Sequence, residues 1–250
     1  PLAIAACLAI APAPALSDED EADLGEVVVT ATRGGNLVQD EPLRVEVLPE
    51  EEIEENLTVQ PGNLTTLLNE LGGVRMQSQA PALGGSALQM RGMPGRNTLV
   101  LMDGLPLLGG QPDSFALLQT PPLDLQRVEL IKGVGSALYG PSALGGVLNL
   151  LSRRPGGDSE LLVNRSSRGG TDLVGFGAAG AGQGLGVTLT GGLHDQSIED
   201  IDDDNWADLA KYWRYTVRPR LFWQADERTV FATVGYVHED RMGGTLPGQP

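Results

Sequence analysis

An acidic stretch at residues 199–208, EDIDDDNWAD, holds six carboxylates and is the densest group of metal-ligating side chains in the sequence. Asp200, Asp202 and Asp204 repeat at the spacing with which a calcium-binding EF-hand loop begins. However, Asn205 stands where such a loop needs glycine, and Lys211 stands where it needs a bidentate glutamate. Two interpretations therefore stay open, a weak calcium site and a solvated loop between two strands.

Arginines form the second group of side chains that could do chemistry. Arg214, Arg218 and Arg220 fall on one face of an extended segment, and together they could attract an anionic ligand. The ordinary polarity of a water-facing sheet surface explains the same pattern equally well.

Patterns typical of enzymes are missing from the sequence. Gly133 and Gly135 follow an apolar run, but Leu138 replaces the third glycine of a dinucleotide-binding loop and Pro141 follows it. No serine lies in a hydrolase elbow, and the two histidines lie on separate predicted strands. We therefore expect no catalysis and no covalently bound cofactor.

Composition narrows the class of protein further. The formal net charge of −16 disfavours nucleic-acid binding, because that affinity comes mainly from neutralising phosphates. The 34 glycines in 250 residues favour turns and β-structure. A single cysteine, Cys7, excludes an internal disulfide and a cysteine zinc cluster.

The first residues read as an export signal. The alanine-rich segment PLAIAACLAIAPAPALS contains the small-x-small pattern Ala13-Pro14-Ala15, so residues 1–16 are predicted to be a signal peptide remnant. Cys7 as a lipidated cysteine is the alternative. The acidic segment that follows should be disordered.

The run EVVVTATR at residues 26–33 is an isolated β-branched stretch between polar and glycine-rich flanks. It could be an edge strand of the next domain, or a strand that adds to the sheet of a partner protein.

Residues 41–156 are predicted to form a compact unit of helices and strands. A helix is expected over NLTTLLNELGG, where Leu64, Leu67, Leu68 and Leu71 make one apolar face. Short strands are expected at ALQMRG, TLVLMDGLPL, RVELIKG and GGVLNLLSRR.

From residue 157 onward a two-residue alternation replaces the helical pattern, as in LGVTLTGGLH. Trp213 and Trp223 share a face, and on a tilted strand they would lie about 25 Å apart along the barrel axis, which matches the two aromatic girdles of an outer-membrane barrel. A soluble β-sandwich is the alternative. About five strands are expected, near 159–167, 171–181, 185–194, 209–223 and 229–239. Because so few strands cannot close a barrel in lipid, we expect the chain to be the front part of a larger protein.

These segments resemble, in order, the TonB-dependent outer-membrane receptors. The resemblance rests on four segments: GEVVVTATR, LLNELGGVRMQ, LQMRGMPGRNTLVLMDGLPL and LDLQRVELIKGVGSALYGPSALGGVLNLLSRRP. It implies a signal remnant at 1–16, a disordered periplasmic segment at 17–40, a plug domain at 41–156 and barrel strands at 157–250. The implied fold class is an α+β plug domain followed by the first antiparallel strands of a transmembrane β-barrel, which the chain leaves incomplete.

The resemblance also assigns residues. The TonB box would be Glu26, Val27, Val28, Val29 and Thr30. In the family, two plug arginines pair with barrel acids and form a plug–barrel lock. Arg91 matches the first, whereas Lys132 replaces the second and loses the bidentate fork of arginine. The barrel acids would lie beyond Pro250.

The implied activity is energy-dependent import across the Gram-negative outer membrane, with the plug and the box facing the periplasm. The expected partners are the C-terminal domain of TonB, outer-membrane lipid and a small-molecule ligand. A ferric siderophore leads as the ligand, with cobalamin, haem or a glycan as alternatives. Cobalamin importers of this family use an acidic calcium-binding loop, which keeps the calcium interpretation open. A secreted soluble β-rich binding protein is the alternative from another class.

Overall fold

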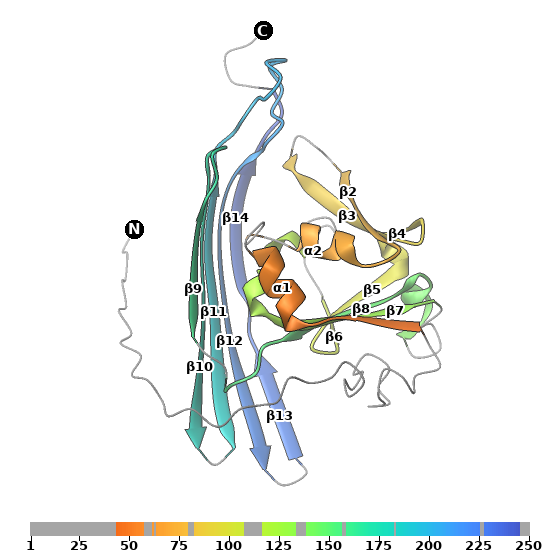
Figure 1. The fold of residues 1–250 in the computed structure, drawn as a ribbon, viewed down its shortest axis with the longest axis vertical. Helices are drawn as coiled ribbons and strands as arrows, with labels where there is room; N and C mark the ends of the chain where they lie inside the picture. Colours follow the sequence, from red (N-terminus) through yellow and green to blue (C-terminus); the bar gives the residue numbers. More distant parts are fainter. Residues whose placement is uncertain are drawn as a thin grey trace.

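The computed structural model describes residues 44–57, 62, 64–79, 83–107, 117–133, 139–156, 159–182, 184–225 and 228–245. Within these ranges, an N-terminal unit of short strands and helices packs against one face of a tall antiparallel sheet, which we call the wall (Figure 1). The predicted signal remnant, the acidic segment and the TonB box lie outside the described residues.

The N-terminal unit contains two sheets. The first has the strand order β1-β7-β8-β5-β6, in which β5 and β8 are parallel and the other pairs are antiparallel. Its strands are β1 (Arg44–Leu48), β5 (Thr98–Met102), β6 (Leu105–Pro106), β7 (Leu125–Lys132) and β8 (Gly146–Ser152). The second sheet is antiparallel and consists of β2 (Val74–Gln79), β3 (Gly85–Met90) and β4 (Met93–Pro94).

Helices connect these strands. The α-helices are α1 (Glu50–Leu57) and α2 (Thr65–Glu70), and the 3₁₀ turns are η4 (Gly95–Asn97), η5 (Leu117–Gln119), η6 (Pro122–Asp124) and η7 (Pro141–Ala143). The predicted apolar face of the second helix is confirmed, because Leu64, Leu67, Leu68 and Leu71 are all buried. They pack in one cluster with residues of β7 and β8, which forms the main core of the unit.

The wall consists of six antiparallel strands. They are β9 (Glu160–Arg165), β10 (Gly170–Gly182), β11 (Leu185–Gln196), β12 (Lys211–Ala225), β13 (Arg228–Thr233) and β14 (Tyr236–Met242). Neighbours along the chain pair from β9 to β13, and β14 pairs with the first half of β12. The last predicted strand, 229–239, is therefore two strands that both lie along β12.

The outer face of the wall is apolar and its inner face is largely polar, the reverse of a soluble sheet packed on a core. The inner face also buries Val174 and Phe176 against Leu57 and Leu123 of the N-terminal unit. Its exposed side chains include Leu161, Val163, Val187, Leu189, Leu193, Trp213, Val217, Leu221, Trp223 and Val230. Its buried polar side chains, which face the N-terminal unit, include Thr188, Thr190, His194, Arg214, Thr216 and Arg220. The predicted alternation is confirmed, and its direction suits a sheet with lipid outside.

None of the helices in the described ranges is long and apolar enough to cross a membrane.

We predict that Gly146→Ala destabilises the N-terminal unit. Gly146 begins β8 with a φ of +147°, and a Cβ atom there would overlap the carbonyl oxygen of Ile131 and the sulfur of Met90. The expected loss is about 1–3 kcal/mol, because an overpacked core must shift its backbone. Urea unfolding of the complete protein would measure it. Gly180→Ala is the control, since nothing lies within 4 Å of its Cβ position, and equal stability of the two variants would contradict the prediction.

Candidate functional site: the interface between the N-terminal unit and the wall

A fully buried carboxylate joins the two parts of the structure. Asp124 ends the turn η6 of the N-terminal unit and has no exposed surface. The two Nη atoms of Arg220 donate to its two oxygens at 2.5 and 2.6 Å, and Nη1 of Arg218 donates at 2.8 Å. The hydroxyl of Thr190 also donates to Asp124. Three wall side chains from β11 and β12 thus converge on one carboxylate.

A second carboxylate balances the charge of this cluster. Oδ2 of Asp103 lies 3.9 Å from Nε of Arg220. Asp103 is held in a left-handed turn, with a φ of 51°, and accepts hydrogen bonds from the amide and hydroxyl of Ser152 at 2.8–2.9 Å. Two arginines of the wall therefore meet two aspartates of the N-terminal unit, and bidentate pairing gives the contact a fixed geometry.

A row of polar side chains crosses the wall in register. Its members lie directly opposite one another on β9, β10, β11, β12 and β14: Asn164, Asp172, His194, Arg214 and Glu239. Asp172 accepts from Asn164 at 3.0 Å and pairs with Nδ1 of His194 at 2.8 Å. Arg214 reaches Glu239 at 3.5 Å, so a carboxylate stands on each side of the His194–Arg214 pair.

Gly62 of the N-terminal unit docks onto this row. Its carbonyl oxygen accepts a hydrogen bond from Nη2 of Arg214 at 2.6 Å. A Cβ at this position would lie 3.1 Å from Oδ1 of Asp172 and 3.4 Å from Nδ1 of His194. Glycine is therefore the residue that lets the backbone approach the row this closely.

A further contact lies where the chain passes from the N-terminal unit into the wall. Arg153 pairs with Glu50 of α1 at 3.1 Å and with Glu160 of β9 at 2.6 Å. Its guanidinium lies 4.5 Å from the ring centre of Phe176. Burial raises the pKa of Glu50 although Arg153 acts against that rise. One arginine thus ties the first helix to the first wall strand.

The three arginines predicted to face a ligand do share the inner face of the wall. Their guanidinium groups, however, contact the N-terminal unit: Arg214 at Gly62, and Arg218 and Arg220 at Asp124. A role in attracting a ligand stays a prediction.

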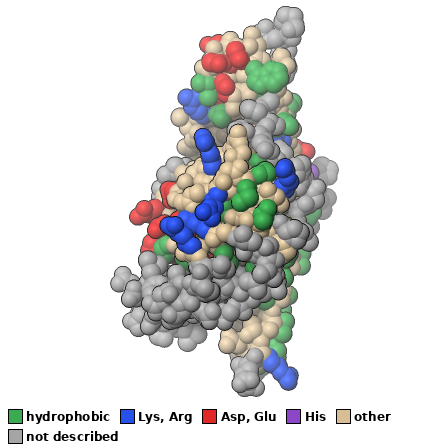
Figure 2. Space-filling model, turned by 90° about the vertical axis from the view of Figure 1, so that its right-hand side faces the viewer, with side chains coloured by type: hydrophobic (Ala, Val, Ile, Leu, Met, Phe, Trp, Pro, Cys, Tyr) green, Lys and Arg blue, Asp and Glu red, His purple; other side chains and the backbone are tan. Residues whose placement is uncertain are grey.

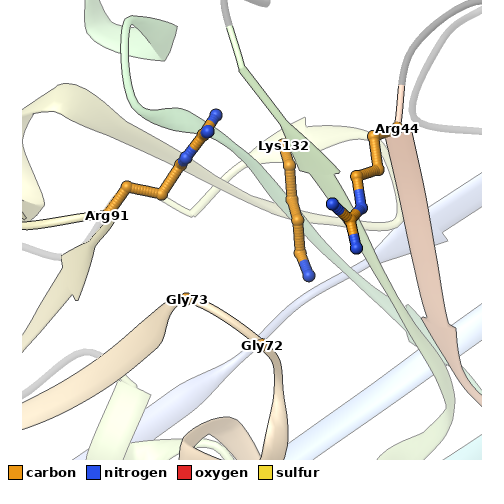
Figure 3. A pocket seen from close by; sticks show the side chains of 5 residues that line it. All are labelled: Arg44, Gly72, Gly73, Arg91 and Lys132. Atoms are coloured by element: carbon orange, nitrogen blue, oxygen red, sulfur yellow. The ribbon is translucent and has the colours of Figure 1, made fainter.

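The two residues predicted for the plug–barrel lock lie together in a basic pocket of about 460 Å³. Arg91 and Lys132 line it with Arg44, Gly72 and Gly73 (Figure 3). This pocket belongs to the N-terminal unit, and Figure 2 shows basic side chains gathered on the unit's face turned away from the wall. Lys132 pairs with Glu46 of the same unit. The lock itself stays a prediction.

Two of the three residues predicted to bind calcium lie together, and the third lies apart from them. Asp200, Asp202 and Asp208 bring ligand oxygens within 4.8 Å of one another. Asp204 is outside this group, and its carboxylate accepts from the amide of Trp206 at 2.8 Å. Calcium binding also stays a prediction.

Sequence reasoning missed the acids at the centre of the interface, namely Asp124, Asp172 and Glu239. The two-residue alternation could have placed Asp172 and Glu239 on the inner face with His194. Asp124 had no such signal, because it ends a short turn between two prolines and a strand.

Comparison with known proteins gives one consistent family. The model of the TonB-dependent Receptor Plug Domain matches residues 38–147. The ferrioxamine B receptor of Salmonella typhimurium is 30% identical over 155 residues, which is 60% of this chain and 21% of that protein. The vitamin B12 transporter BtuB of Photobacterium profundum is 31% identical over 166 residues, 66% of this chain and 27% of that protein.

Solved structures agree on the fold. The siderophore receptor PirA from Acinetobacter baumannii superposes with a TM-score of 0.65 at 21% identity, over 86% of this chain and 34% of that chain. The chain thus spans about a fifth to a third of the length of the relatives it matches.

We predict that Asp124→Ala loosens the N-terminal unit from the wall. The change leaves the buried Arg220 and the partly buried Arg218 without their main partner, and losing the partner of a buried pair costs about 3–5 kcal/mol. The measurement is the urea concentration at which the N-terminal unit of the complete protein becomes sensitive to protease. Asp195→Ala, an exposed aspartate on β11, is the matched control. If both variants behave like the unaltered protein, the ion cluster does not hold the interface.

Proposed function

Because the chain belongs to the TonB-dependent receptors, whose plug domain its residues 38–147 match, we propose that the complete protein imports a scarce small molecule across the outer membrane. The division follows the one expected from the sequence: signal remnant 1–16, periplasmic segment 17–40, plug 41–156 and barrel strands 157–250. No bond in the ligand is made or broken.

The observation that carries the proposal is the buried charge cluster around Asp124. An importer needs a plug that rests firmly on the wall and can still be moved. Groups held by ion pairs and hydrogen bonds can exchange these partners for water when the plug shifts, whereas a separated apolar core would expose its whole surface. The interface combines these polar contacts with one small apolar cluster of Leu57, Leu123, Val174 and Phe176, which suits a plug that is released and returned.

We propose that the force that moves the plug is transmitted through the TonB box, Glu26–Thr30. The C-terminal domain of TonB would capture this stretch by adding it to the edge of its own sheet. The box precedes β1, which is an edge strand of the first sheet, so a pull on the box reaches the plug at its sheet edge.

The proposed ligand is a ferric siderophore, which fits the ferrioxamine receptors among the relatives and the siderophore receptors among the similar folds. Cobalamin is the second candidate, favoured by the similarity to a vitamin B12 transporter. Haem and glycans stay open. Whichever ligand is imported, the outer apolar face of the wall would contact outer-membrane lipid, and the plug would face the periplasm.

We predict that Val28→Pro abolishes energy-dependent uptake while leaving ligand binding intact. Proline removes a backbone donor from the strand that must pair with TonB. Uptake of labelled ferric siderophores and labelled cobalamin by cells that carry the complete protein would measure the effect. The control is Ala22→Pro, which places the same residue in the acidic segment before the box.

The substrate is the ligand whose uptake is lost in Val28→Pro and kept in Ala22→Pro. Uptake that persists unchanged in Val28→Pro would contradict the coupling proposed for residues 26–30.

A further inference from the structure

The start of β12 and the end of β14 pair with each other and carry a cluster of side chains on the inner face of the wall. Residues 237, 239 and 241 of β14 point inward, and Glu239 and Arg241 lie directly opposite Arg214 and Tyr212 of β12. Oε1 of Glu239 accepts from Nε of Arg241 at 2.7 Å, and its Oε2 lies 3.5 Å from Nη1 of Arg214. One carboxylate thus contacts two arginines, one through each oxygen.

The two arginines reach different parts of the plug. Nη2 of Arg214 donates to the carbonyl of Gly62, which lies between α1 and α2, at 2.6 Å. Nη1 of Arg241 donates to the carbonyl of Leu83, which lies just before β3, at 2.6 Å. The start of β3 lies toward the same end of the molecule as the 197–210 connection of the wall (Figure 1).

We propose that Glu239 is a positioning residue that aims Arg214 and Arg241 at two separate loops of the plug. The inference deepens the proposed function and rests on it in one respect, namely that these loops lie on the side from which a ligand would approach. Its structural content, the docking of two loops through one carboxylate, does not depend on transport.

The need for a carboxylate follows from burial and charge. The side chains of Arg214 and Arg241 are only 2% and 12% exposed, and both guanidinium groups lie over the ring of Tyr212, at 5.5 and 4.6 Å. Two guanidinium groups held this close repel each other. Each arginine side chain can also adopt many rotamers. Glu239 offsets the repulsion and fixes both forks.

Both arginines bind carbonyl oxygens of the plug backbone, not plug side chains. A carbonyl acceptor exists at every residue, so Leu83 could change its side chain without losing this anchor, whereas a Cβ at Gly62 would lie 3.1 Å from Oδ1 of Asp172. Each loop is held by its own arginine, and both arginines contact the same carboxylate. Glu239 therefore supports the attachment of both loops to the wall.

Hydrogen–deuterium exchange of the complete protein in detergent micelles tests this. The readouts are the amides of residues 62–67 and 83–86, with residues 117–125 around Asp124 as the internal reference. Glu239→Ala should raise exchange about tenfold or more in both loops, because each loses an oriented, charge-assisted hydrogen bond. Arg214→Ala should affect only the first loop, and Arg241→Ala only the second. Glu239→Gln keeps a single carbonyl oxygen and should protect only one loop.

Asp240→Ala is the matched control, since its side chain is 80% exposed on the opposite face of the same strand. It should leave both loops at the rate of the unaltered protein. Unchanged exchange in Glu239→Ala, a rise in only one loop, or an equal rise in the reference segment would overturn the proposal. A protein that fails to import any ligand would still give the expected exchange pattern, so the two proposals fail separately.

Discussion

A buried carboxylate is stable only while its cationic partners stay in place. Asp124 of the plug depends in this way on Arg218 and Arg220 of the wall. The carboxylate comes from the plug and the arginines come from the wall, so the contact cannot form within either part alone. Around it, Thr190 and Asp103 complete the hydrogen bonds and the charge balance. The other interface contacts lie along the same inner face.

The direction of polarity in the wall follows from the same constraint. Its inner face carries the arginines, the histidine and the threonines that the plug covers, so its apolar residues other than the cluster of Val174 and Phe176 lie mostly on the outside. Soluble sheets bury their apolar face, and a sheet that exposes it needs an apolar surrounding such as lipid. In the proposed function the plug and the membrane thus contact opposite faces of the same strands.

Much of the fold could be predicted from the sequence because it depends on local periodicity. The leucine face of α2 and the alternation of β11 and β12 are visible in single segments, and the structure confirms both. The interface depends instead on pairs that are far apart in the chain, such as Asp124 with Arg220 and Gly62 with Arg214. Arg218 and Arg220 were recognised as a shared face, but nothing local shows that a turn 94 residues earlier supplies their partner. Asp124 itself has no periodic neighbours that would assign it to a face.

The most direct test is a double-mutant cycle between Asp124 and Arg220 in the complete protein, with Asp124→Leu and Arg220→Met made singly and together. The measured quantity is the free energy of releasing the plug from the wall, followed by urea titration. If the pair holds the interface, each single change leaves a buried charge uncompensated, and the double variant recovers about 2 kcal/mol or more of the summed losses. Losses that simply add would show that the two side chains act independently, and would contradict the account.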